Sequence, residues 1–160
     1  MIFDNNFTHC NPIVIDAVFL YCFTIGKLIG SDKSDLKERI DEAISATEKV
    51  CKKECGKEVN EWFDLALLFA ETQNVYKESL DPSRNIGFLK HGFVLSYFFL
   101  KQLHNKSFSE CIAQTMSFAG DTDTNGAIVG GMLGACVGRS ELPKEYVEKV
   151  LNCGPKKGSG

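Results

Sequence analysis

The chain has 160 residues, which is enough for one domain with a substantial core and too few for two. Its composition, 44% hydrophobic and 24% charged, is that of a folded globular protein. A net charge of −3 excludes the strongly basic surface of a nucleic-acid-binding domain, so we expect no nucleic-acid partner. We predict one domain over residues 1–153 and a flexible tail over residues 154–160.

The first predicted helix begins at Pro12, because Asn11 is a good N-cap and proline is favoured at the first helical position. It should end near Gly30. The run 13–30 is apolar, but Asp16 and Lys27 leave only about ten uncharged residues between them, whereas a membrane span needs roughly 20. We therefore predict a buried core helix and no membrane partner.

Two further helices are predicted in the first half of the chain. One begins near Ser34 and carries apolar residues at intervals of three and four up to Val50. The next follows Gly56 and runs to about Ala70. The polar segment 71–85 is predicted to be a loop, and its length suggests a functional role.

The second half of the chain predicts four more helices and no strand. The run 87–103 is hydrophobic on nearly all sides, which is typical of a helix at the centre of a bundle. Ser107 and Glu110 form a capping box at the start of the next helix. An aspartate-rich turn leads into a glycine-rich apolar helix that ends near Gly138, and Pro143 begins the last helix. The fold class is therefore all-α.

Seven cysteines are spread along the chain. Their number is odd, several lie in apolar runs, and no secretory leader is visible. This pattern predicts buried, reduced thiols in a cytoplasmic protein. Cys51 and Cys55 share a predicted helical face, but no second pair of cysteines or histidines is spaced to complete a zinc site with them.

The turn at 120–125 holds the candidate metal ligands. Asp121 and Asp123 stand two residues apart at a helix entrance, and Thr124 adjoins them. Two carboxylates and a hydroxyl suit Mg²⁺, Ca²⁺ or Mn²⁺ better than zinc. Glycines recur every four residues from 126 to 134, although each costs a helix about 1 kcal/mol relative to alanine. Another backbone should therefore approach this face and hold the carboxylates rigidly.

Two other interpretations of this turn remain open at this point. Asp121 and Asp123 could simply be helix caps that favour the positive end of the helix dipole. Alternatively, the turn could begin an EF-hand, since acidic or amide residues occupy its positions 1, 3 and 5 and Gly126 its position 6. Met132, however, stands at position 12, where a calcium loop needs a bidentate glutamate.

The whole run 107–138 resembles the closing core motif of the ADP-ribosylglycohydrolase family. In that family a helix leads into Gly-Asp-x-Asp-Thr, and a small-residue helix leads out. The hydrophobic run 87–103 resembles the family's preceding helix. Thr8-His9 followed by Pro12 resembles its Thr-His-x-x-Pro element. The resemblance covers most of the chain from residue 8 to about 151 and is weakest over 31–86.

The resemblance implies an orthogonal multi-helix bundle that is incomplete here. Family members bind two Mg²⁺ ions between an N-terminal and a C-terminal acidic cluster, and Mn²⁺ or Ca²⁺ are alternatives. Asp121, Asp123 and Thr124 would be metal ligands, with Asp123 best placed to bridge the ions. His9 would lie near the ADP-ribose. The implied reaction is hydrolysis of the bond at the anomeric carbon of ADP-ribose in an ADP-ribosylated substrate.

The sequence also departs from the family pattern. The family's N-terminal half supplies a Thr-Asp-Asp-Thr ligand cluster, a reactive glutamate and a glycine-rich substrate loop, none of which has a counterpart here. We therefore expect a truncated or split form, or a partial gene model, that does not hydrolyse substrate alone. A missing half should leave an exposed apolar face, which predicts self-association. The alternative is an inactive relative that serves as a binding or structural module.

Overall fold

A computed structural model of the chain describes residues 9–154. Within these residues every regular element is helical, which confirms the all-α class. The elements are α2 (Pro12–Ile29), α3 (Leu36–Glu54), α4 (Lys57–Thr72), α5 (Leu89–Gln102), α6 (Phe108–Ser117), α7 (Thr122–Val137), the short 3-10 helix η1 (Arg139–Glu141) and α8 (Lys144–Leu151). Thr8 and nearly all of the predicted tail lie outside the described residues.

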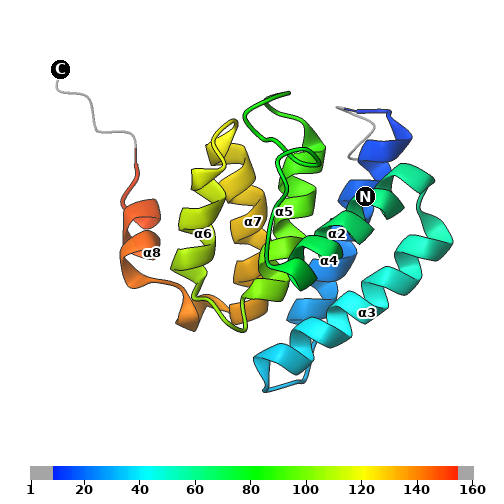
Figure 1. Ribbon diagram of the computed structural model, residues 1–160. Coiled ribbons are helices and arrows are strands. Elements are labelled where there is room, and N and C mark those ends of the chain that lie inside the picture. The colour runs from blue at the N-terminus through cyan, green and yellow to red at the C-terminus, as the bar shows by residue number, and fades with distance from the viewer. Residues whose placement is uncertain (1–8, 155–160) are drawn as a thin grey trace.

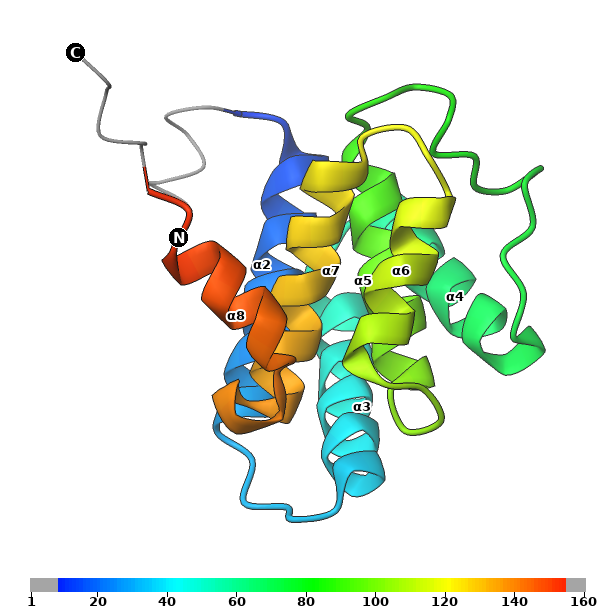
Figure 2. The ribbon, with the colours of Figure 1, turned by 90° about the vertical axis from the view of Figure 1, so that its left-hand side faces the viewer.

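Helix α5 lies at the centre of the bundle, with α4 on one side and α7 on the other (Figure 1). All ten residues from 91 to 100 are buried. This confirms the central position predicted from its hydrophobicity on all sides. Helices α2, α5 and α7 begin at the same end of the bundle, where the connection between α4 and α5 also passes (Figure 2).

Helix α2 begins as predicted, because the side chain of Asn11 accepts a hydrogen bond of 2.9 Å from the backbone N–H of Ile13. The prediction of a buried core helix is wrong for most of its surface. Its buried residues form one stripe at three- and four-residue spacing, namely Ala17, Leu20, Thr24 and Leu28. The helix packs on α3 and α7 with this stripe, so only 22% of its length is buried.

By length and composition alone, α2 could also cross a membrane, since it has 18 residues with a mean hydropathy of 1.8. The core helix of a soluble protein and a signal sequence share these properties. Among the described residues, it is the one helix with this character. Most of its other residues are of intermediate burial, and Ile29 is its one exposed large hydrophobic residue.

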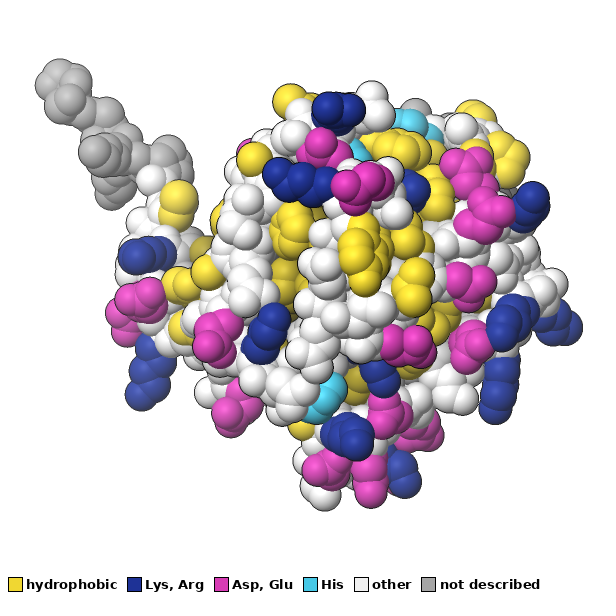
Figure 3. Space-filling view, in the orientation of Figure 1, with side chains coloured by type: hydrophobic (Ala, Val, Ile, Leu, Met, Phe, Trp, Pro, Cys, Tyr) yellow, Lys and Arg dark blue, Asp and Glu magenta, His cyan; other side chains and the backbone are white. Residues whose placement is uncertain are grey.

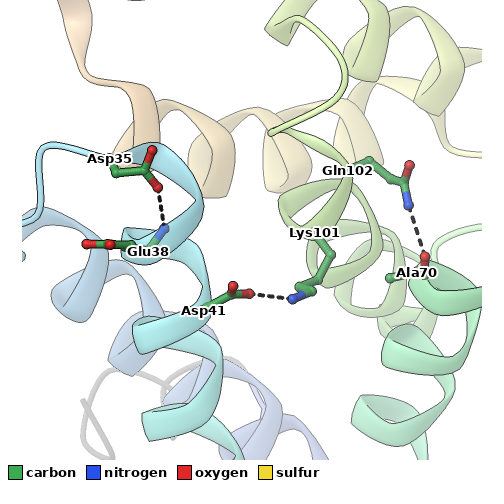
Figure 4. A network of polar contacts seen from close by, with 6 residues as sticks. All are labelled: Asp35, Glu38, Asp41, Ala70, Lys101 and Gln102. Carbon is green, nitrogen blue, oxygen red and sulfur yellow. Dashed lines mark hydrogen bonds and ion pairs between the residues drawn. The ribbon is translucent and has the colours of Figure 1, made fainter.

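Polar side chains connect α3, α4 and α5 (Figure 4). Helix α3 begins close to the predicted Ser34, and Asp35 caps it by accepting a hydrogen bond from the N–H of Glu38 at 2.8 Å. Lys101 on α5 contacts Asp41 on α3 at 2.6 Å. Gln102 donates a hydrogen bond of 3.2 Å to the carbonyl of Ala70. Gln102 is buried, so its bond should contribute more than the partly exposed ion pair.

Three of the cysteines are free thiols inside the core, as predicted, whereas Cys10 and Cys153 are exposed. Cys51, Cys111 and Cys136 are buried. Burial, followed by the charge of neighbouring Cys55, raises the pKa of Cys51 to about 12. These three cysteines pack as small apolar residues of the core.

A buried polar cluster joins α2, α3 and α5. The hydroxyls of Thr24 and Thr47 lie 2.8 Å apart, and that of Tyr97 lies 2.9 Å from Thr24. Each threonine hydroxyl also bonds to a backbone carbonyl one turn earlier, that of Leu20 or Ala43. Because each hydroxyl carries one proton, Tyr97 serves as the donor to Thr24 when Thr24 donates to its carbonyl.

We predict that Thr24→Val destabilises the protein more than Tyr97→Phe. The first change removes the described partner of the buried Tyr97 hydroxyl and should cost about 2 kcal/mol. The second removes a donor and leaves the threonine hydroxyls paired, which should cost about 1 kcal/mol. Urea unfolding of both variants measures the difference. Equal losses would contradict the assigned donor direction.

Candidate metal and substrate site

The predicted metal ligands lie at the start of α7. Asp121 directly precedes the helix, and Asp123 and Thr124 belong to its first turn. Ala119 and Gly120 reverse the chain just before them, with φ of +60° and +72°. The turn therefore presents both carboxylates at the positive end of the α7 dipole, which favours their ionised form.

The two carboxylates contact each other. The pKa of Asp123 is lowered, first by a hydrogen bond with the carboxyl of Asp121 and then by the backbone N–H of Thr124. That N–H lies 3.0 Å from Oδ1 of Asp123. The Asp121 side chain makes no capping hydrogen bond. Asp121 therefore stands at the N-cap position without a hydrogen bond to the helix, and its oxygens can be shared with a ligand.

The EF-hand interpretation is wrong. Residues 122–137 form one continuous helix, whereas a calcium loop must remain irregular for about 12 residues. Met132, which stands where the calcium loop needs its glutamate, is fully buried in the core and is not a calcium ligand.

The glycines of α7 pack differently from the prediction. A Cβ on Gly126 would lie 2.3 Å from Cε of Met116, but one on Gly134 would meet nothing within 4 Å. A Cβ on Gly131 would lie 2.7 Å from the Tyr21 hydroxyl, which donates a 2.7 Å hydrogen bond to the carbonyl of Ile128. The close neighbours are thus side chains of α6 and α2. No second backbone meets the face of Gly126, Gly130 and Gly134.

The connection between α4 and α5 covers the turn, a contact that the sequence did not predict. A Cβ on Gly120 would lie only 1.9 Å from the carbonyl oxygen of Pro82. A Cβ on Gly87, where φ is +81°, would lie 3.7 Å from Oδ2 of Asp121. The polar character and length of residues 71–85 were the only sequence signals for this role.

His9 is exposed and precedes α2. Since α2 and α7 begin at the same end of the bundle, His9 lies on the side of the molecule that carries the Asp121–Thr124 turn (Figure 2). Its role in binding ADP-ribose stays a prediction. The described residues include no group of three or more acidic, histidine or cysteine side chains arranged to hold a metal.

The fold and the site together are those of an all-helical protein with two carboxylates at the entrance of a glycine-rich helix. The sequence pattern of the ADP-ribosylglycohydrolase family matches residues 3–158, so the chain belongs to that family. The chain is also similar to the ADP-ribosyl-[dinitrogen reductase] glycohydrolase of Rhodospirillum rubrum, with 35% identity over 57 residues. These residues are 36% of this chain and span 18% of that protein's length. No solved structure matches the chain.

We predict that Gly120→Ala disturbs the site more than Gly138→Ala. Both glycines have positive φ, +72° and +77°, so each change should cost about 1–3 kcal/mol in backbone strain. Only at Gly120 would the new methyl group also strike the Pro82 carbonyl, because nothing lies within 4 Å of Gly138. Gly120→Ala should therefore displace the connection.

Amide hydrogen exchange measures this effect. Exchange over residues 74–88 should increase in Gly120→Ala and stay at the wild-type rate in Gly138→Ala. Similar exchange in both variants would show that the Pro82 contact does not hold the connection in place.

Proposed function

We propose that this chain forms the C-terminal metal- and substrate-binding part of an ADP-ribosylglycohydrolase. The reaction is hydrolysis of the bond at the ribose anomeric carbon of an ADP-ribosylated substrate. One observation carries the proposal, namely that Asp121, Asp123 and Thr124 lie together at the start of α7, where the Asp121 side chain makes no hydrogen bond to the helix. Family membership supports the reaction class.

The donor set fits one hard cation. Asp121 and Asp123 offer carboxylate oxygens and Thr124 a hydroxyl, which are the ligand types that Mg²⁺ prefers, and Mn²⁺ or Ca²⁺ accept them as well. Asp123 and Thr124 are exposed and Asp121 is half-buried, so a hydrated ion can reach all three. With three ligands from the protein, the remaining coordination positions of the ion are left to water and substrate oxygens.

The chain's own residues would act on the sugar in three ways. The Asp123 side chain is exposed and, as an ordinary aspartate, is ionised at neutral pH. A carboxylate near the ribose offsets the positive charge that develops at the anomeric carbon. His9 would hydrogen-bond the ADP-ribose, and the connection at Gly87 would shield one side of Asp121 from water. Mg²⁺, when bound, supplies Lewis acidity and orients the ribose hydroxyls.

The chain by itself holds one ligand set of the two that the family site uses. We propose that the second set comes from another segment of the family fold, or from a second copy of the chain, and that the half-exposed face of α2 takes part in this contact. The reduced, buried thiols support a cytoplasmic location. We propose no role for nucleic acid or a membrane.

A second candidate function is a binding module without hydrolytic activity. It is favoured by the absence, within the described residues, of a third acidic side chain beside Asp121 and Asp123. Such a module would bind ADP-ribose in the presence of Mg²⁺ without cleaving any linkage.

Calorimetry of the chain with Mg²⁺ and ADP-ribose tests the site. We expect weak Mg²⁺ binding, and ADP-ribose binding that depends on it. Asp123→Asn keeps the shape of the side chain and removes its charge, so it should weaken Mg²⁺ binding by roughly tenfold or more. Asp32→Asn, at an exposed aspartate between α2 and α3, makes the same charge change and should have no effect.

If wild-type protein and Asp123→Asn bind equally, or neither binds, the proposal fails and the turn has a structural role. Release of ADP-ribose from an ADP-ribosylated protein then separates the two candidate functions. Hydrolysis identifies an enzyme, whereas binding without release identifies the module.

A further inference from the structure

The connection between α4 and α5 borders a small cavity that opens to solvent and that the proposed metal site does not use. Its volume is about 260 Å³, and residues 77–81, 84–85 and the first turn of α5 line it. Pockets for drug-sized ligands measure about 300–1,000 Å³, so this cavity suits a smaller group. Basic and acidic side chains gather over this connection (Figure 3).

The N-terminus of α5 opens onto this cavity without a side-chain cap. Asn11, Asp35 and Ser107 each cap their own helix with a side-chain oxygen. At α5 the N-cap residue is Phe88, which has no oxygen to offer. The first N–H groups of this 14-residue helix therefore have no side-chain acceptor, and its dipole is positive here. Such a helix end readily binds an anion.

His91 is a second, independent sign of a ligand. Its side chain lines the cavity, and the residue is only 5% exposed. Its described contact is the edge of the Phe88 ring, and no described residue hydrogen-bonds to its imidazole nitrogens. Every fully buried side-chain nitrogen or oxygen in the described residues has a partner. An imidazole nitrogen of His91 without a protein partner is therefore accessible from outside the core, and a ligand in the cavity can accept a hydrogen bond from it.

Charged groups around the cavity favour an anion. Lys77, Arg84 and Lys90 line it, against the carboxylates of Glu78 and Asp81. Three cations and two carboxylates leave one net positive charge.

Asp81 is already occupied, because it accepts hydrogen bonds from the N–H and hydroxyl of Ser83. Its other oxygen lies 3.4 Å from Nε of Arg84. Among the described residues, no ion pair involves the two terminal nitrogens of Arg84, which suit a phosphate.

We propose that this cavity binds a phosphate group, held by the N-terminus of α5, the His91 imidazole, Lys77 and Arg84. The site is separate from the carboxylate pair, since neither Asp121 nor Asp123 lines the cavity. The phosphate could be free inorganic phosphate or part of a nucleoside diphosphate. The proposal depends on neither Mg²⁺ binding nor hydrolysis.

Imidazole NMR signals of the whole chain provide the test, with inorganic phosphate as the probe. The sequence has three histidines, and the exposed His104, which has no assigned role, serves as the internal reference. Phosphate should shift the His91 signal in a saturable manner and leave the His104 signal nearly unchanged. No saturable shift at His91 would overturn the proposal.

A charge variant tests the cations without touching the core. The exposed pair Lys77→Gln and Arg84→Gln should weaken phosphate binding by about tenfold or more, as expected for lost charge-assisted hydrogen bonds. The control pair, Lys144→Gln and Lys149→Gln on α8, removes the same charge from another exposed surface. Equal weakening in both pairs would show a general charge effect and would also overturn the site.

Two further arms separate this site from the proposed function. Asp123→Asn should retain wild-type phosphate binding even where it loses Mg²⁺ and ADP-ribose binding. Loss of phosphate binding in Asp123→Asn would contradict a separate site. ADP-ribose added to the phosphate-saturated chain identifies the source of the phosphate. Competition indicates the diphosphate of that ligand, and simultaneous binding indicates inorganic phosphate.

Discussion

The burial of α5 on every side is the constraint on which the rest of the structure depends. A helix with no solvated face must be enclosed, and α4, α7 and the neighbouring helices enclose it. Tyr97 on α5 also reaches the threonine hydroxyls of α2 and α3. Because α5, α7 and α2 run in the same sense, their N-terminal ends meet at one end of the bundle. The polar residues of both candidate sites therefore lie at this end of the bundle.

The connection between α4 and α5 turns this helix end into a shaped site. It must cross the end of the bundle to reach the start of α5, and it passes so close to the α6–α7 turn that only glycine fits at position 120. The connection lies close to Asp121 at Gly87, and it borders the cavity at His91. A single segment thus forms a wall of both candidate sites. A change in the conformation of this segment would therefore alter the shape of both sites.

Local chemistry explains which parts of the fold the sequence predicted. The helix starts at Asn11-Pro12 and Ser107 depend on caps within a few residues, and the structure confirms them. The central place of 87–103 followed from hydrophobicity alone. The burial of α2 was overestimated, because an apolar composition does not reveal how many neighbours surround a helix. The glycine pattern of α7 led us to expect a second backbone, whereas the close neighbours are the side chains of Met116 and Tyr21. These residues come from other helices, and the pattern within α7 does not reveal them.

In the candidate site too, local features could be predicted from the sequence and contacts between distant segments could not. Asp121, Asp123 and Thr124 are neighbours in sequence, so their common place at the start of α7 could be predicted without a fold. The contacts of Pro82 and Gly87 with the turn join residues about 35–40 positions apart, and the buried state of His91 depends on the loop around it. No periodicity or short motif encodes such contacts. They arise only when α5 is enclosed and the connection has to cross the bundle.

The electrostatics of this end explain how acidic and basic groups can stand so close together. The dipoles of α5 and α7 are both positive here, so each favours a negative partner. At α7 the chain supplies that partner itself, in Asp121 and Asp123. At α5 it supplies none, because Phe88 occupies the cap and basic residues surround the opening. The first helix end is therefore neutralised by carboxylates that can attract a cation, whereas the second remains positive and can attract an anion. A ligand that carries phosphate groups beside metal-binding ribose hydroxyls would satisfy both ends at once.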